Sequence, residues 1–225
     1  EVCSNAAWRS TVAPLVPGRG GGIYCAGAEL TVCGTTDVHH CEAEERGGGL
    51  YAGGQSVVRI RDSGCAFYCN SATSGGGVAV LYSSSLRIFD ASFYGNTALV
   101  HGGAIVVEEA ATARVQGALA DFGNTVQPNY SHQYGGGVAV LGGELAVYNH
   151  ARLGHNAADL RGGAIYLSNA ICRINGAQIG EYAPGYTNSS STGGGIYVGY
   201  GSTLLLTNGA RVVQGLAEYN GGGIY

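Results

Sequence analysis

Two aspartates of this chain are placed as a pair of catalytic carboxylates could be. Asp62 and Asp90 each follow an isoleucine by two residues, in similar surroundings. Paired carboxylates of this kind cleave glycosidic bonds. The equivalent positions later in the chain hold small or turn-forming residues, namely Gly117, Asn149, Gly176 and Asn208. A series of Asp, Asn and Gly is typical of a tight turn, so we predict turn residues and rank a polysaccharide lyase or glycosidase third among the functions considered.

Two arginines accompany these aspartates. Arg59 and Arg87 lie at equivalent positions, and the alternation of side chains along a strand turns both outward. They could bind an acidic sugar, but we favour stacked surface ion pairs as their role.

A short segment offers several metal-ligand types. His39 and His40 precede Cys41, and three glutamates follow within four residues. Zinc needs three or four converging ligands, whereas adjacent histidines on a strand point to opposite faces. The aspartate pattern of calcium-binding nonapeptide repeats is absent, as is the lysine of a phosphate-binding loop. We therefore predict no metal, no cofactor and no catalytic residues.

The tyrosines form the most prominent outward set of side chains. By alternation, five of them are expected to face outward and to stack on successive repeats: Tyr24, Tyr51, Tyr166, Tyr197 and Tyr225. Such rows could contact sugar rings or a partner chain. The alternative, which we favour, is that the rings stack on one another and stabilise an exposed sheet.

Seven cysteines occur, six of them in the first seventy residues. This clustering predicts disulfides at one end of the fold and an oxidising compartment. Cys41 and Cys69 fall on neighbouring repeats, about 5 Å apart, which suits a disulfide. The further candidate pairs are Cys33 with Cys65 and Cys3 with Cys25. Cys172 is expected to be a buried free thiol.

Two Asn-x-Ser sequons begin at Asn129 and Asn188. Both fall in the longest intervals of the chain, which we interpret as insertions at residues 125–134 and 181–192. A glycan needs a surface loop. We therefore predict glycosylation of Asn129 and Asn188 on two loops that leave the same corner of the fold.

All of these residues lie on a motif that returns eight times, with two or three small residues, mostly glycine, before an aliphatic residue. The aliphatic residues are Ile23, Leu50, Val78, Ile105, Val138, Ile165, Ile196 and Ile224, at intervals of 27 to 33. Self-similarity at such a period predicts a solenoid. No segment has a sustained helical period, and glycine supplies 41 of 225 residues, so we do not expect a helical solenoid.

Each repeat contains short apolar pieces with the alternation of strands, such as Ile196-Tyr197-Val198 and Leu86-Arg87-Ile88. A third inward position follows each turn, as at Phe93. The sequence therefore predicts an all-β fold, a right-handed single-stranded parallel β-helix. We expect roughly seven to eight coils of about 27 residues with three short strands per coil.

Two motifs resemble those of a known family. The GGAI motif occurs at residues 102–105 and 162–165, and the FxxN motif at 67–70 and 93–96. These are similar to the repeats of the chlamydial polymorphic outer membrane proteins and related extracellular β-helix proteins. The resemblance implies a surface-exposed β-helix with an adhesive role. Its asparagines are expected to form one column, Asn70, Asn96, Asn124 and Asn156, with Cys41, Tyr182 and Gly215 at the positions that lack asparagine.

The amino-acid composition limits the kinds of partner that this protein can be expected to bind. The net charge is −4, only 12% of residues are charged, and every basic residue is arginine. Nothing here suggests nucleic-acid binding. No run reaches the roughly 18 apolar residues of a membrane-spanning helix. We expect an extracellular or cell-surface location.

Residues 1–19 contain no repeat, and we expect them to form a cap or linker before a β-helix over residues 20–225. Beyond Tyr225 the helix is expected to continue or to be covered by a partner, for example by end-to-end self-association. Our first hypothesis is a non-enzymatic extracellular structural protein that builds a fibre or cell-surface coat. The second is a surface adhesin or glycan-binding module.

Overall fold

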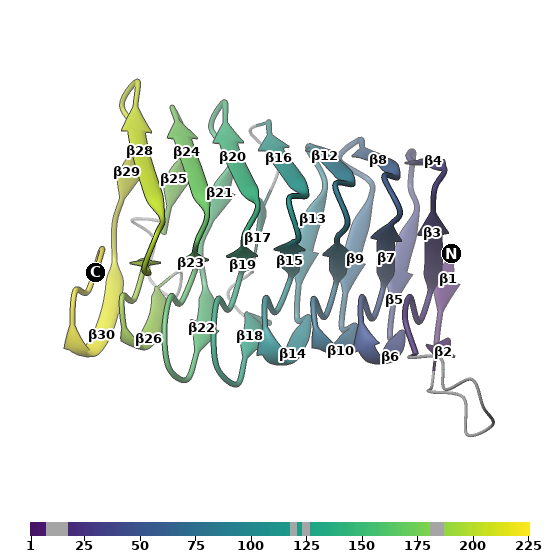
Figure 1. Cartoon of the computed structure of the whole chain (residues 1–225), viewed down its shortest axis with the longest axis horizontal. Helices are drawn as coiled ribbons and strands as arrows, with labels where there is room; N and C mark the ends of the chain where they lie inside the picture. Colours follow the sequence, from purple (N-terminus) through teal and green to yellow (C-terminus); the bar gives the residue numbers. More distant parts are fainter. Residues whose placement is uncertain (8–17, 118–120, 123–126, 181–186) are drawn as a thin grey trace.

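The chain folds as a parallel β-solenoid. The computed structural model describes residues 1–7, 18–117, 121–122, 127–180 and 187–225. Over these residues it contains 30 strands and no helix. Strands from equivalent positions of successive repeats pair side by side, so that the chain winds through about seven turns along one axis (Figure 1). The described residues accordingly contain no helix of the length and apolarity needed to cross a membrane.

Each turn passes through four sheets in the order C, D, A and B. Sheet C contains β3 (Ile23–Ala26), β7 (Leu50–Gly53), β11 (Val78–Val80), β15 (Ile105–Glu108), β19 (Val138–Leu141), β23 (Ile165–Ser168) and β27 (Ile196–Val198). Sheet D contains β4 (Glu29–Val32), β8 (Val57–Arg61), β12 (Ser85–Phe89), β16 (Thr112–Gln116), β20 (Glu144–Tyr148), β24 (Ile171–Asn175) and β28 (Thr203–Thr207).

The other two sheets each gain a strand at the N-terminal end. Sheet A contains β1 (Val2–Cys3), β5 (Asp37–His39), β9 (Ala66–Tyr68), β13 (Ser92–Tyr94), β17 (Asp121–Phe122), β21 (Arg152–Leu153), β25 (Gln178–Ile179) and β29 (Arg211–Val212). Sheet B contains β2 (Ala6–Ala7), β6 (Glu42–Arg46), β10 (Ser71–Ser74), β14 (Thr97–His101), β18 (Asn129–Ser131), β22 (Asn156–Ala158), β26 (Asn188–Thr192) and β30 (Gly215–Asn220).

The prediction of three strands per coil is wrong, because each coil has four. The strands that the sequence pattern did not predict are those of sheet B. One of them, β10, has the sequence Ser-Ala-Thr-Ser. Their inward positions hold small residues, for example Ala72 and Ser74 in β10. A strand that buries alanine and serine lacks the apolar alternation by which strands are recognised.

Part of the segment expected to form a cap or linker, residues 1–19, pairs directly with the solenoid. β1 pairs with β5, and β2 pairs with β6, both in parallel. The solenoid therefore includes the first seven residues, which supply a partial turn to sheets A and B. Residues 8–17 lie outside the described part of the chain.

The predicted core columns are confirmed. The aliphatic residue of each repeat lies opposite its equivalent in the next turn, from Ile23 and Leu50 through Ile165 and Ile196. Glycines allow this close stacking at the corner before sheet C. Gly102 has a φ of 65°, and a Cβ on Gly103 would overlap the carbonyl oxygen of Gly136. The corner therefore needs residues without a bulky side chain.

A buried ladder of asparagines links the coils at the corner between sheets A and B. Its members are fully buried: Asn70, Asn96, Asn129, Asn156 and Asn188. Each Nδ2 donates to the Oδ1 of the next member at 3.0–3.2 Å, except at the last. Most also donate to a backbone carbonyl of the turn before, as Asn96 does to Phe67 O at 2.8 Å. The ladder satisfies polar groups that burial would otherwise leave unpaired.

The predicted asparagine column is confirmed at three of its four positions. Asn124 lies outside the described residues, and Asn129 takes the ladder position in that turn. In the turn assigned to Tyr182, which is also outside the described residues, Asn188 takes it. Cys41 does occupy the equivalent position, since its backbone N donates to Asn70 Oδ1, and Gly215 pairs with Asn188. The extra residues thus precede the ladder asparagine.

Replacing Ile105 with aspartate is expected to prevent folding. Ile105 is fully buried in the central turns, and an ionised carboxylate there would have no partner. Ile105→Val is the matched control and is expected to cost about 1 kcal/mol. Soluble yield and circular dichroism measure the effect. A soluble Ile105→Asp protein with a native spectrum would contradict the assigned core.

Removing one rung of the ladder is expected to destabilise the whole rod. Asn96→Ala leaves the backbone N of Asn70 and the Phe67 carbonyl without their side-chain partner. The expected loss is about 3 kcal/mol in the free energy of unfolding. Asn175→Ala removes a half-buried amide that accepts one solvent-exposed hydrogen bond, from Asn208 Nδ2, and it serves as the surface control, with an expected change of about 0.5 kcal/mol. Denaturant unfolding measures the free energy of unfolding of both variants. Equal losses would show that a ladder asparagine contributes no more to stability than a surface asparagine.

Candidate functional site

The two aspartates occupy turns between sheets D and A. Asp62 and Asp90 have left-handed φ values of 86° and 59°, and the equivalent residues along the chain share this conformation. Asp62 Oδ2 also accepts a hydrogen bond from the backbone N of Gly34 at 2.9 Å. The prediction that this column consists of turn residues is therefore confirmed. Of the two arginines beside them, Arg59 pairs with Glu29 at 3.1 Å.

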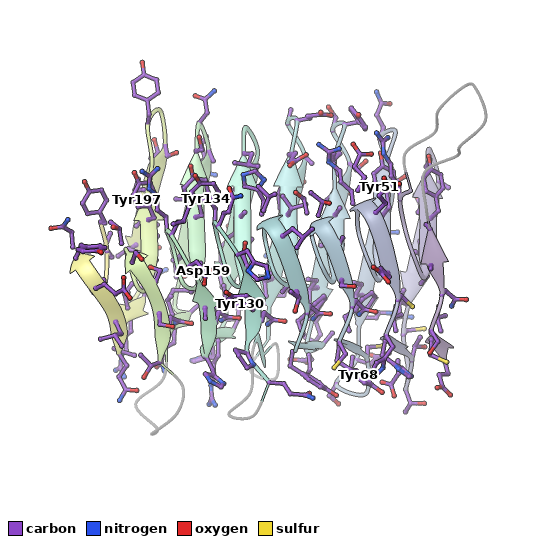
Figure 2. The ribbon with its side chains drawn as sticks, turned by 90° about the horizontal axis from the view of Figure 1, so that it is seen from below. Tyr51, Tyr68, Tyr130, Tyr134, Asp159 and Tyr197 are labelled. Carbon is purple, nitrogen blue, oxygen red and sulfur yellow. The ribbon has the colours of Figure 1, made fainter. Side chains whose placement is uncertain are left out.

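The outward tyrosines at the C-terminal half form a continuous stack on sheet C. Tyr166 and Tyr197 lie with ring centroids 5.4 Å apart, and Tyr197 and Tyr225 are 5.2 Å apart. Tyr134 extends the stack from the end of sheet B, 4.8 Å from Tyr166. The guanidinium of Arg161 lies 5.0 Å from the Tyr197 ring centroid. Figure 2 shows Tyr134 and Tyr197 on one side of the rod.

The other predicted pair, Tyr24 and Tyr51, stacks but is not equally accessible. The two rings are 5.0 Å apart and nearly parallel. Tyr51, however, is only 2% exposed, so the expectation that it could contact a partner is wrong. Arg19 covers it, with a guanidinium 5.4 Å from the ring centroid and Nη1 3.4 Å from the hydroxyl. Arg19 precedes the first repeat motif and follows the first partial turn by more than ten residues in the sequence. The repeat pattern therefore could not predict its contact with Tyr51.

Stacking limits what these tyrosines can bind. A sugar ring binds an aromatic side chain through the ring face, and neighbouring rings occupy the faces inside each column. Tyr166 has Tyr134 on one side and Tyr197 on the other. The columns therefore present ring edges and hydroxyl groups along their length, which favours a stabilising role over a sugar-binding one.

Sequence reasoning missed a second aromatic column on the outer face of sheet A. His39, Tyr68 and Tyr94 stack at centroid distances of 4.6 and 5.0 Å. The signal was present in the FxxN motif, where a tyrosine follows the inward phenylalanine twice. Outward alternation places these tyrosines in register.

A polar cluster on sheet B also went unrecognised. Tyr130, which lies beside Asp159 (Figure 2), donates a hydrogen bond to Asp159 Oδ1 at 2.5 Å. His132 Nδ1 lies 3.5 Å from Asp159 Oδ2. Burial and this hydrogen bond raise the pKa of Tyr130 to about 12. Burial, together with the charge of Arg46, lowers the pKa of His101.

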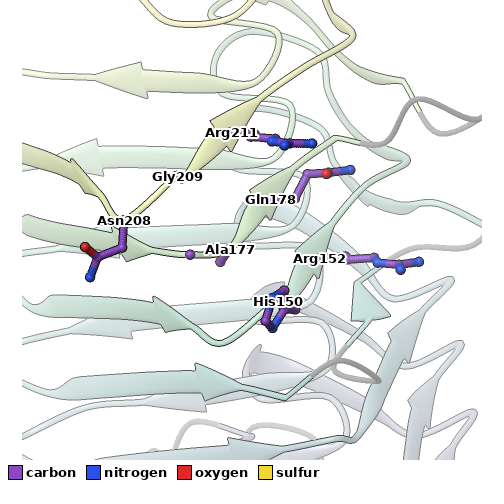
Figure 3. A pocket seen from close by; sticks show the side chains of 8 residues that line it. His150, Arg152, Ala177, Gln178, Asn208, Gly209 and Arg211 are labelled. Atoms are coloured by element: carbon purple, nitrogen blue, oxygen red, sulfur yellow. The ribbon is translucent and has the colours of Figure 1, made fainter.

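A hollow of about 410 Å³ lies where the turns after sheet D meet sheet A (Figure 3). Arg152, Gln178 and Arg211 follow one another in register on its wall, and His150 and Asn208 complete it. Two guanidinium groups two turns apart, with an amide between them, offer donors suited to an anion. No sequence motif predicts this hollow, because its residues meet only through the register of successive turns.

Among the residues that the structure describes, one set of side chains could hold a metal ion. Glu1, Cys3 and His39 bring a carboxylate, a thiol and an imidazole within 4.8 Å of one another. Glu1 Oε1 and His39 Nε2 are 2.9 Å apart and hydrogen bonded. The set shares only His39 with the segment weighed from the sequence. Cys41 is turned inward instead, with its Sγ 3.3 Å from the His39 carbonyl.

None of the predicted disulfides is present among the seven cysteines, which are all free thiols. Cys41 is buried at the ladder position, whereas Cys69 occupies the left-handed corner residue before it, with a φ of 53°. The two are thus one position out of register. The pairs Cys33–Cys65 and Cys3–Cys25 are likewise unbonded. Burial raises the pKa of the Cys172 thiol to about 12, as expected for a core position.

The prediction that both sequons lie on surface loops is wrong. Asn129 and Asn188 are fully buried members of the ladder. Asn129 Nδ2 donates to Phe93 O at 2.9 Å, and Asn188 Nδ2 donates to Leu153 O at 2.8 Å. Because Nδ2 is the atom that carries an N-linked glycan, the folded coil has no room for one at either residue.

Comparison with known families supports the repeat motif. Residues 90–108 match the Chlamydia polymorphic membrane protein repeat. This segment contains one FxxN and one GGAI motif, so the resemblance inferred from the sequence is confirmed there. No curated protein and no solved structure gives a significant match. The chain is therefore a parallel β-solenoid with a repeat of this type.

The cysteines are expected to differ sharply in reactivity. Cys33 is exposed, whereas Cys172 is buried and stays protonated near neutral pH because its pKa is about 12. Iodoacetamide at pH 8 should modify Cys33 in the native protein and leave Cys172 intact. Peptide mapping reads out both sites, and a denatured sample in which both react is the control. Fast native modification of Cys172 would show that its turn is not packed as described.

Proposed function

We propose that this chain is a non-enzymatic, surface-displayed structural protein in which the solenoid acts as a rigid scaffold. The observation that carries the proposal is the continuity of the asparagine ladder over five successive turns. The ring stacks and the aliphatic columns run parallel to it. A rod with so many repeated contacts is suited to spacing and display.

The family match supports a position at the outer membrane or cell surface. The matched repeat is that of a polymorphic membrane protein, and it includes both sequence motifs of the resemblance. An extracellular building unit of a fibre or coat is consistent with such a location. End-to-end self-association remains part of this proposal.

The proposal that the protein is not an enzyme is based on the structural roles of its carboxylates. Asp62 and Asp90 serve turns, and Glu108 pairs with Arg46 at 3.1 Å. Glu45 also contacts Arg46, at 2.5 Å. Each of these acids has a structural role that needs no substrate.

A surface adhesin is the second candidate. It is favoured by the matched repeat and by aromatic side chains that remain accessible, such as Tyr24 and Tyr225 at the ends of their stacks. Each of these end rings has only one stacked neighbour among the described residues.

Imaging and activity assays test the scaffold role together. Negative-stain images should show rods whose solenoid portion is about 35 Å long, from about seven turns at the usual strand spacing, alone or joined end to end. Pectin, alginate and glucans should not be cleaved. Asp62→Asn and Asp90→Asn should leave folding unchanged, since Asn149 and Asn208 occupy equivalent turns. Turnover that either substitution abolishes would overturn the non-enzymatic assignment, and flexible, shapeless particles would overturn the scaffold.

A further inference from the structure

Three arginines form a ladder on the outer face of sheet D. Arg59 on β8 pairs in register with Arg87 on β12, and Arg87 pairs with Arg114 on β16. Neighbouring strands are about 4.8 Å apart, so three guanidinium groups follow one another at that spacing. Like charges placed directly opposite each other on a sheet are destabilising unless they are neutralised.

The ion pairs that the described residues form on this face lie at its two ends. Glu29 pairs with Arg59 at 3.1 Å, and Glu144 pairs with Arg173 two turns beyond Arg114. Within the described residues, neither Arg87 nor Arg114 forms an ion pair with a carboxylate. The centre of the ladder thus holds exposed positive charge in a protein whose net charge is −4.

The centre of the arginine ladder borders a depression in the surface, and one of its arginines is held by neighbouring side chains. A depression of about 230 Å³ is lined by Arg87, Phe89, Arg114 and Gln116, with Ile88 beneath. Gln116 Oε1 accepts a hydrogen bond from Arg114 Nε at 3.0 Å. The guanidinium of Arg114 also lies 4.7 Å from the Tyr148 ring centroid. These contacts hold Arg114 in place beside the depression.

Phe89 supplies an open aromatic surface beside these charges. Its side chain is 45% exposed. The register places Gln116 opposite it in the next turn and Arg61 in the turn before. In contrast to the stacked tyrosines, Phe89 therefore has no aromatic neighbour on its column in the adjoining turns. Its exposed surface is therefore available for apolar contact with a sugar.

We propose that this face of sheet D binds a linear acidic polysaccharide, with the sugar chain running along the solenoid axis. Arg87 and Arg114 would each bind an anionic group of successive sugars, through the forked donors that suit a carboxylate. Phe89 would pack against a pyranose ring. The spacing of the turns is close to the length of one pyranose in an extended chain. This binding role goes beyond the scaffold role and does not depend on it.

The test measures binding of oligogalacturonate, a linear polyuronate, by isothermal titration calorimetry. Arg87→Gln and Arg114→Gln should each weaken binding about tenfold, the loss expected for one charged hydrogen-bonding group. Phe89→Ala should weaken it about threefold or more. Arg173→Gln is the matched control, because it removes the same charge from the same face at a position already paired with Glu144, and it should change binding less than about twofold.

Three comparisons make the outcome decisive. Neutral dextran should not bind, and dextran sulfate tests whether sulfate replaces carboxylate at the same arginines, which would support the site with a different anion. Circular dichroism confirms that each variant is folded. The proposal is overturned if folded wild-type protein binds neither anionic polymer. It is also overturned if Arg173→Gln weakens binding as much as Arg87→Gln, or if a single-stranded oligonucleotide binds equally well with the same dependence.

Discussion

Backbone hydrogen bonding between successive turns fixes one spacing, about 4.8 Å, for every column of side chains in this protein. Because the register is maintained from one turn to the next, a residue type that recurs in the sequence meets its own kind in space. What such a meeting does depends on the side chain. Asparagine amides donate and accept, so they form a chain of hydrogen bonds. Aromatic rings stack, and arginines repel one another.

This constraint separates the structural columns from the one we assign to binding. The asparagine ladder and the tyrosine stacks are internally satisfied, since each internal member finds partners in the neighbouring turns. The arginine ladder is not, because repetition adds charge without adding a counter-ion. A column that repetition destabilises is therefore a better candidate for a ligand than one that it stabilises.

The sequence was sufficient to predict features that depend on repetition alone. The columns of Ile105 and its equivalents, the turns at Asp62 and Asp90, and the stacking of Tyr166 on Tyr197 all follow from the repeat register. Features that depend on where extra residues leave the coil were mistaken. Asn129 and Asn188 were assigned to loops because the length of an insertion can be read from a sequence, whereas its point of departure cannot.

The repeat pattern also could not predict that a residue outside the repeats buries an outward side chain. Tyr51 alternates outward as predicted, but Arg19 covers it. The strands of sheet B were missed because alanine and serine fill the small space at that side of the coil, where no larger apolar residue marks an inward position.

The asparagine ladder has a consequence for how such a chain can change in evolution. Each internal rung accepts from the turn before it and donates to the turn after it, so one turn is interchangeable with another at these contacts. Recombination between repeats that adds or deletes a whole turn would leave every remaining rung with its partners. The number of turns, and with it the length of the rod, can therefore vary among descendants of one gene. An insertion of only a few residues within a turn has to leave the coil as a loop, because the ladder contacts fix the register.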